Sequence, residues 1–146
     1  MQARMIDVDA GNILKLRGAV PKQLTDIALE VSGQSEVSVH HVTLVRLDDL
    51  GINPAKVQLP APPSVLELEE SVWLVDSGAK QACVVNATAE TQRCLKDYTL
   101  ACLAALGLSQ DCLDASRVFH VTLTNAGGGE VRASIGEPWK YPSKQV

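Results

Sequence analysis

The sequence predicts an α+β domain built from two halves that share one order of elements. Its 146 residues are 46% hydrophobic, which is enough for one core without a disulfide or metal. Segments dense in β-branched residues alternate with two segments of helical periodicity. The tetrapeptide HVTL also occurs twice, at residues 41–44 and 120–123, each time in a strand-like segment that follows a helical one. We therefore expect a single domain over residues 1–146.

The first half is expected to hold a strand, a helix and a second strand. Residues 12–18 (NILKLRG) alternate as a short strand does. Between Pro21 and Gly33, apolar residues recur at helical spacing, with proline at the first turn and glycine just past the end. Residues 37–47 (VSVHHVTLVRL) are rich in β-branched side chains and predict a central strand that carries the first HVTL.

The middle of the chain is expected to be a connection followed by two strands. Residues 48–64 hold four of the seven prolines and show no periodicity, which indicates a loop within one compact domain. Residues 65–70 (VLELEE) and 72–76 (VWLVD) then predict two strands that meet at a turn.

The second half repeats the order of the first with a longer helix. Residues 81–87 (QACVVNA) are strand-like, and Thr88 is a suitable N-cap for a helix that runs to about Leu106, with Gly107 as its C-cap. Residues 117–125 (RVFHVTLTN) predict the strand that carries the second HVTL.

The tail is expected to return to the second HVTL strand. Residues 127–129 (GGG) predict a hairpin turn, and residues 130–136 a strand that pairs back on it. One half of the domain would thus comprise residues 1–52 plus strands near 130–140, and the other residues 64–125.

Cysteines and charge exclude several classes of protein. The cysteines at 83, 94, 102 and 112 form no CxxC pair and have no histidine at ligand spacing. We expect them to be reduced, with Cys94 and Cys102 buried in the second helix, and we predict no metal and no cofactor.

A net charge of −4 disfavours binding to long double-stranded DNA but allows a small anionic ligand. No run of eighteen apolar residues and no basic leader is present, which favours a cytoplasmic protein without a membrane segment.

The two HVTL strands offer a specific chemistry. Because side chains alternate across a strand, His41 and Thr43 point to one face, as do His120 and Thr122, while valine and leucine point to the other. Two imidazoles can act as base and acid on a phosphodiester, and two hydroxyls can hold its oxygens. The sequence does not tell which histidine takes which role.

A packing explanation competes with this one. A single histidine in a strand is more often a satisfied structural residue. Two of the three histidines lie in the same tetrapeptide, 120 − 41 = 79 positions apart, and this repetition favours the chemical interpretation. His40 alternates to the face opposite His41, with Val42 and Leu44, so we assign it no catalytic role.

Paired H-x-T strands of this kind are the signature of the two-histidine phosphoesterase superfamily, which the sequence resembles through residues 41–44 and 120–123. The resemblance implies a bilobal, pseudo-duplicated LigT-like fold with antiparallel sheets flanking a central groove. It also implies metal-independent action on 2′,3′-cyclic or 3′,5′ phosphodiesters. The small size is most similar to phage anti-CBASS nucleases, which destroy cyclic oligonucleotide signals; a phage-encoded protein would then act in the host cytosol.

The tail offers candidate substrate-binding residues. Trp139 and Tyr141 follow the predicted strand, with Glu137 nearby. An indole can stack on a nucleobase, and a carboxylate can accept a hydrogen bond from an exocyclic amino group. Equally, a tryptophan near the end of a chain often caps the core, and both interpretations stay open here.

Four cations on predicted strands are candidates to meet a phosphate: Lys15, Arg17, Arg46 and Arg132. Arg46 alternates away from His41, which favours a structural or solvent-facing role for it.

The leading expectation is a metal-independent phosphodiesterase that hydrolyses small cyclic oligonucleotides. The alternatives are a LigT-like enzyme that acts on the 2′,3′-cyclic phosphate end of RNA, and a non-catalytic sponge that sequesters a nucleotide. A purely structural α+β domain is the rival from outside nucleotide chemistry. The oligomeric state is not indicated by the sequence.

Overall fold

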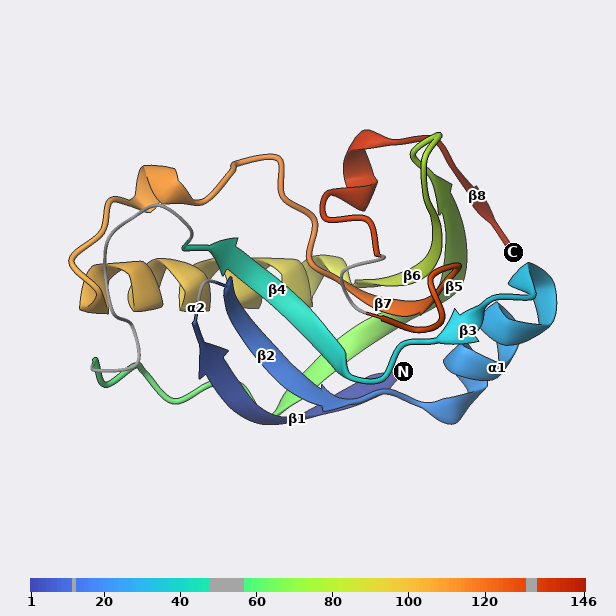
Figure 1. Cartoon of the computed structure of the whole chain (residues 1–146). Coiled ribbons are helices and arrows are strands. Elements are labelled where there is room, and N and C mark those ends of the chain that lie inside the picture. Colours follow the sequence, from blue (N-terminus) through green and yellow to red (C-terminus); the bar gives the residue numbers. More distant parts are fainter. Residues whose placement is uncertain (12, 48–56, 131–133) are drawn as a thin grey trace.

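The computed structural model describes residues 1–11, 13–47, 57–130 and 134–146. It is an α+β structure with an antiparallel eight-stranded sheet and two α-helices (Figure 1). The first elements are β1 (Gln2–Ala10), β2 (Ile13–Ala19), α1 (Lys22–Ser32), β3 (Ser35–Glu36) and β4 (His40–Arg46). The remainder are β5 (Val65–Asp76), β6 (Gln81–Ala87), α2 (Ala89–Ala105), η2 (Gln110–Cys112), β7 (His120–Asn125), η4 (Pro138–Lys140) and β8 (Ser143–Gln145).

The long strand β5 connects the two parts of the sheet. The strand order is β3-β7-β6-β5-β1-β2-β4, and β8 pairs with β5 off this path. The first residues of β5 pair with β1, and the register to β6 shifts between Leu68 and Val72. The prediction of two strands that meet at a turn was therefore wrong. A bulge-like irregularity bends one continuous strand at the polar residues 69–71 without ending its pairing.

The two HVTL strands lie side by side although they are far apart along the sheet. β4 is the last strand of the path, yet it packs against β7 near the other end. Figure 1 shows β4 and β7 as neighbours at the centre of the molecule. The backbone N–H of Val37, just before β4, also donates to the carbonyl of Leu123 in β7 at 3.1 Å. The sheet thus curves until its ends meet.

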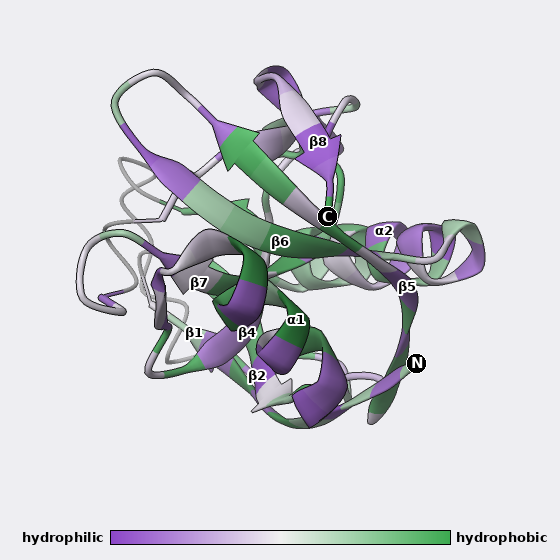
Figure 2. Cartoon of the chain, turned by 90° about the vertical axis from the view of Figure 1, so that its right-hand side faces the viewer, coloured by the Kyte–Doolittle hydropathy of each residue, from purple (hydrophilic) through white to green (hydrophobic). Residues whose placement is uncertain are grey.

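The core lies on the helix-covered face of the sheet. Val42 and Leu44 of β4, with Val121 and Leu123 of β7, are fully buried in one cluster. The predicted alternation of both HVTL strands is thereby confirmed. Each such side chain contributes about 1.5–3 kcal/mol by leaving water. Figure 2 shows the hydrophobic residues of β5 and β6 running through the sheet beside the two helices.

The helices begin and end close to their predicted limits. α1 follows Pro21 and ends at Gly33, whose positive φ of 64° suits glycine. α2 begins after Thr88, whose side chain accepts a hydrogen bond from the backbone of Thr91. The C-cap of α2 is Leu106, with Gly107 one residue later.

The cysteines are all free, but their burial differs from the prediction. Cys102 is buried as expected, whereas Cys94 is exposed. Cys94 lies on the solvent face of α2 because the buried stripe of this helix passes through Leu95 and Tyr98.

Three strands in the described part of the chain were not predicted, and one predicted strand is only partly described. The additions are β1, which pairs with β2 and β5, β3, which pairs with β7, and β8, which pairs with β5. Of the expected strand 130–136, residues 131–133 lie outside the described part of the chain, Arg132 among them. Glu130 and residues 134–136 do not form a strand.

Among the described residues, no helix is long and apolar enough to cross a membrane.

Candidate active site

The repeated motif is longer in the structure than the four letters HVTL. Residues 39–44 read VHHVTL and residues 118–123 read VFHVTL, so a valine stands two positions before each histidine. His120 approaches the carbonyl oxygen of Val118 with its Nδ1 at 3.1 Å. Burial lowers the pKa of His41, and the backbone of Val39 opposes this shift, as the backbone of Val118 does for His120. The backbone two positions before each imidazole thus favours the protonated ring.

The hydrogen bond to the carbonyl of Val118 fixes the tautomer of His120. A carbonyl oxygen only accepts hydrogen bonds, so Nδ1 of His120 donates to Val118. The Nε2 atom of the neutral ring then carries the lone pair that can take up a proton.

Burial makes His120 a weak base in the unliganded protein. The residue is only 8% exposed, and burial lowers its pKa from 6.5 to about 4. The hydrogen bond to Val118 opposes this shift, while the charges of Arg117 and His41 add to it. His120 is therefore neutral at pH 7, and His41 lies close enough to act on it electrostatically.

His41 is half-buried, and its surroundings differ from those of His120. Burial lowers its pKa, and the charge of Lys15 on the neighbouring strand β2 lowers it further. In the β2–β4 pairing, Lys15 lies opposite Thr43 and Arg17 opposite His41. Two of the predicted phosphate-binding cations thus lie beside the first motif.

Both of these cations have acidic partners on β1. Arg17 makes a two-point contact with Asp7, at 3.0 and 2.7 Å. Lys15 lies 3.9 Å from Asp9, a looser pair. The face around His41 therefore holds charges of both signs, and Lys15 is the cation less tightly bound by its partner.

The structure brings Trp139 to His120. Their ring centroids are 6.1 Å apart and the rings are inclined by 58°. The guanidinium of Arg117 lies 4.9 Å from the centre of the Trp139 ring, and its Nη1 donates to the carbonyl of Thr43 at 3.4 Å. Arg117 thereby connects the approach to β7 with the backbone of β4.

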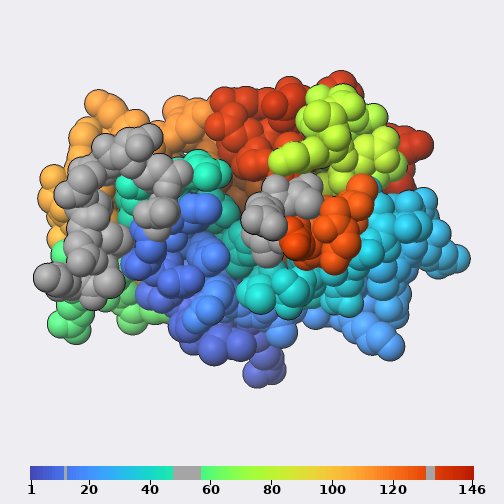
Figure 3. All heavy atoms as spheres, viewed as in Figure 1, coloured from blue at the N-terminus to red at the C-terminus, as the bar shows by residue number. Residues whose placement is uncertain are grey.

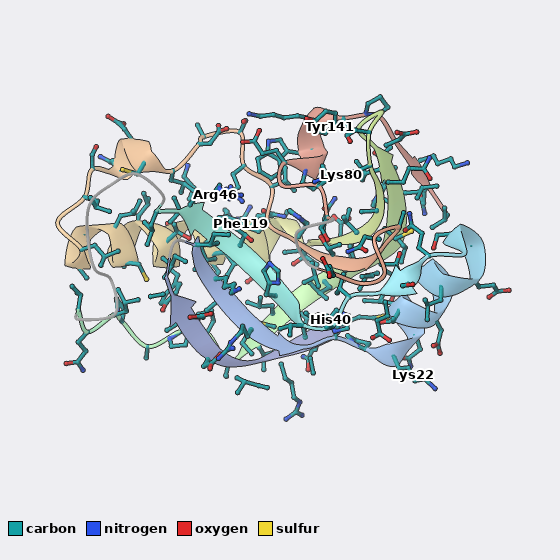
Figure 4. All side chains as sticks on the ribbon, viewed as in Figure 1. Lys22, His40, Arg46, Lys80, Phe119 and Tyr141 are labelled. Atoms are coloured by element: carbon teal, nitrogen blue, oxygen red, sulfur yellow. The ribbon has the colours of Figure 1, made fainter. Side chains whose placement is uncertain are left out.

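The other two predicted substrate-binding residues lie further out. Glu137 pairs with Lys140 at 2.6 Å, and Lys140 also approaches Asp114 at 3.6 Å. Tyr141 is 43% exposed and lies at the outer side of the C-terminal segment (Figure 4). Figure 3 shows the C-terminal residues packed against the loop that precedes β7. This segment covers His120 while leaving Tyr141 in solvent.

Arg46 lies on the side of the motif residues, so the prediction that it turns away from His41 was wrong. Leu44 and Val45 are both buried, which shows that the strict alternation of β4 breaks at this point. The β2–β4 register is irregular at the same place. The charge of Arg46 accordingly lowers the pKa of Arg117.

His40 lies outside the cavity at His120, although its charge contributes to the lowered pKa of the neighbouring His41. It lines a different cavity together with Lys22 of α1, and its Nε2 lies 3.6 Å from a carboxylate oxygen of Glu36. Figure 4 shows His40 and Arg46 at the two ends of β4. His40 thus serves as an internal control for the other two histidines.

The glycine turn after β7 has a structural role. The carboxamide oxygen of Asn125 accepts from the backbone N–H groups of Gly127 and Gly129. A Cβ at Gly129 would lie 2.3 Å from the carbonyl oxygen of Glu36, so the turn packs tightly on the chain before β4.

In the described residues, no group of three or more His, Cys, Asp or Glu side chains is placed to hold a metal ion.

A cavity of about 180 Å³ reaches His120 from the C-terminal side. Its walls come from β5, β6, the chain before β7 and the C-terminal segment, and the residues are Trp73, Val75, Val84, Asn86, Val118, His120, Pro138, Trp139 and Ser143. His41 does not line it.

Three residues at this site were not indicated by the sequence: Arg117, Trp73 and Asn86. Only Arg117 carried a signal, because it lies three residues before a motif histidine.

Comparisons with protein-family models, with curated proteins and with solved structures find no match to this chain. The two motif strands and their surroundings are therefore the basis for a functional proposal.

Proposed function

We propose that the protein is a metal-independent phosphodiesterase of the two-histidine type, which hydrolyses small cyclic oligonucleotides. One observation carries this proposal above the others. His41 and His120 lie on neighbouring strands, the backbone two residues before each ring favours its protonated form, and the charge of one ring acts on the other. Packing alone gives no reason for placing two such rings in the same backbone setting.

The difference between the two pKa values supports an assignment of roles. His120 has Nε2 free to accept and stays neutral at pH 7, so it is the base. His41 is the acid. Its pKa is lowered in the free protein, but a bound phosphodiester places a negative charge beside it, which favours the protonated ring.

The reaction on a 3′,5′ linkage then balances as follows. His120 removes the proton of the neighbouring 2′-hydroxyl, whose oxygen attacks phosphorus. The bond from phosphorus to the 5′-oxygen breaks, and His41 donates its proton to this leaving oxygen. Thr43 and Thr122 hydrogen-bond to the non-bridging oxygens, where negative charge increases in the transition state. A cyclic phosphate is opened in the same way, with water in place of the hydroxyl.

The order of elements supports a pseudo-duplicated, bilobal fold of this superfamily. β2, α1 and β4 form one strand-helix-strand unit, and β6, α2 and β7 form another. In each unit the two strands pair antiparallel, and the later strand carries the motif. The groove for the phosphate would run where β4 and β7 meet.

Product analysis tests the proposal directly. The protein is incubated with cyclic dinucleotides, cyclic trinucleotides and 2′,3′-cyclic nucleotides in excess chelator, and products are identified by mass. We expect cleavage of a cyclic oligonucleotide by the native protein and by His40→Ala, and its loss in His41→Ala and His120→Ala. Cleavage of 2′,3′-cyclic nucleotides alone would move the assignment to the LigT-like RNA-processing enzymes.

The non-catalytic alternative has one observation in its favour. Both motif histidines have lowered pKa values, and two neutral rings suit a nucleotide-binding sponge as well as an enzyme. A sponge returns intact ligand after denaturation, whereas an enzyme returns product. If no nucleotide is cleaved and none shifts the melting temperature, both nucleotide functions are wrong and a structural role remains.

A further inference from the structure

The cavity beside His120 has the walls of a site for a flat ring. Both tryptophans of the chain contribute to it, Trp73 from β5 and Trp139 from the C-terminal segment. The aliphatic residues Val75, Val84 and Val118 complete most of the lining. Aromatic side chains stack on nucleobases for about 1–3 kcal/mol per base.

The register of the sheet places this cavity on the catalytic face. Trp73 pairs with Val84 between β5 and β6, and Asn86 of β6 lies opposite His120 of β7. Side chains directly opposite one another in an antiparallel pair point to the same face. Trp73, Val84 and Asn86 therefore continue outward from His120 across three strands.

Asn86 is the polar feature of this lining that packing does not explain. Its half-buried carboxamide makes no hydrogen bond with any described residue, although it carries two donors and an acceptor. The Nε1 atoms of Trp73 and Trp139 are also buried without an acceptor in the described residues. Leaving the two buried indole N–H groups without an acceptor costs about 1–3 kcal/mol each, a cost that the packing of this wall does not explain.

We propose that the cavity receives one nucleobase of the substrate and that Asn86 recognises the hydrogen-bonding edge of that base. This inference rests on the proposed function, because it takes the phosphate of the same nucleotide to be the one that meets His120. The volume of about 180 Å³ is below the ~300–1,000 Å³ of sites for drug-sized ligands. The cavity therefore accepts a single base, and the rest of a cyclic oligonucleotide stays outside it.

The carboxamide sets the chemical preference. An asparagine side chain presents a donor next to an acceptor and matches the adjacent N6–H donor and ring-nitrogen acceptor of adenine. A carboxylate at the same place has only acceptors and matches the two adjacent donors of guanine, N1–H and N2–H. Asn86→Asp is therefore expected to shift the base preference toward guanine, with little change in the size of the side chain.

Tryptophan fluorescence measures occupancy of the cavity without any reaction. Adenosine, guanosine, cytidine and uridine carry no phosphate, and both tryptophans of the protein line the cavity. The full chain is titrated with each nucleoside to millimolar concentration. We expect saturable quenching, strongest for adenosine, a loss of about tenfold in adenosine affinity in Asn86→Ala, and tighter guanosine binding in Asn86→Asp. Gln23→Ala, which removes an exposed carboxamide on α1, is the matched control and should change nothing.

The outcomes separate this inference from the proposed function. If substrate is cleaved but no nucleoside quenches the fluorescence, or if Asn86 variants keep the native preference, the base site is wrong and the phosphodiesterase stands. If nucleosides bind with the expected preferences but no phosphodiester is cleaved, the base site stands and the enzymatic proposal fails. Melting curves of each variant confirm that it is folded before its affinities are compared.

Discussion

The two motif strands have the same letters and unlike surroundings. β4 presents His41 on a face shared with the cations Lys15 and Arg17, and the ring is half-buried there. β7 presents His120 beneath Trp139, next to the cavity lined by both tryptophans, and the ring is almost fully buried. Identical tetrapeptides thus give one half-buried imidazole beside Lys15 and Arg17, and one almost fully buried imidazole beneath an indole. The neighbours, not the motif, determine how each histidine titrates.

Removing either imidazole gives the largest expected effect. His41→Ala and His120→Ala should each lower kcat by about 10²–10⁴, because each removes one of the two proton transfers. Turnover is measured on the cyclic oligonucleotide that the native protein cleaves best, with circular dichroism to confirm folding. His40→Ala should keep full turnover; an equal loss in that variant would show that the motif histidines have no special role.

The acid sensitivity of the fold should differ between the two histidines. A pKa of His120 lowered from 6.5 to about 4 corresponds to about 3 kcal/mol of stability. The unfolded chain binds the proton more readily, so this stability is complete above pH 6.5 and is lost as the pH falls toward 4. Urea denaturation between pH 7 and pH 4 measures it.

Variants at the two histidines provide the control for this measurement. His120→Gln should flatten the fall in the free energy of unfolding, and His41→Gln should flatten it less. Parallel curves for the native protein and His120→Gln would contradict the burial of the second histidine.

Arg117 connects the two environments, and its removal should have an intermediate effect. Arg117→Gln loses the contact with Trp139 and the hydrogen bond to Thr43, at a cost of about 1–3 kcal/mol in the free energy of unfolding. It should also raise the pKa of His120, because the guanidinium charge lowers that pKa in the native protein. NMR titration of the ring protons reports the second change. Arg93→Gln, on the exposed side of α2, is the matched control, and an unchanged His120 titration in Arg117→Gln would contradict the proposed contact.

Lys15 should have the smallest effect, confined to the first histidine. Lys15→Met removes a cation that lowers the pKa of His41, so that pKa should rise by less than about 1 unit. The alkaline limb of the activity profile should move to higher pH with it, because His41 acts in its protonated form. Arg4→Met, on the exposed part of β1, should leave His41 unchanged. A fall in the His41 pKa on removal of Lys15 would be incompatible with the charged environment described for β4.

Local patterns predicted those parts of the fold that local physics controls. The alternation in β4 and β7, the capped helix α2 and the exit of α1 at Gly33 all follow from side-chain periodicity and backbone preference. The strands 65–70 and 72–76 were expected to meet at a turn, but pairing with β1 and β6 before residue 69 and with β6 after residue 71 keeps β5 continuous. Pairing partners far along the chain are not encoded in a local pattern.

The candidate site shows the same division. His41, Thr43, His120 and Thr122 are recognisable because they repeat, but nothing in the letters marks Asn86 or Trp73, which reach the site only through the register of β6 and β5. Arg46 was misjudged because an irregular pairing moved it across the strand. Residues that depend on register or on a bulge become visible only once the strands are paired.

The continuity of β5 determines how the protein can be divided. One uninterrupted stretch of backbone belongs to the sheet of the first motif at its start and to the sheet of the second motif at its end. No hinge separates the halves there, so each histidine is held in register with the other by main-chain geometry. Fragments cut within residues 69–71 would each lack part of their own sheet, and neither half could be exchanged as an independent module.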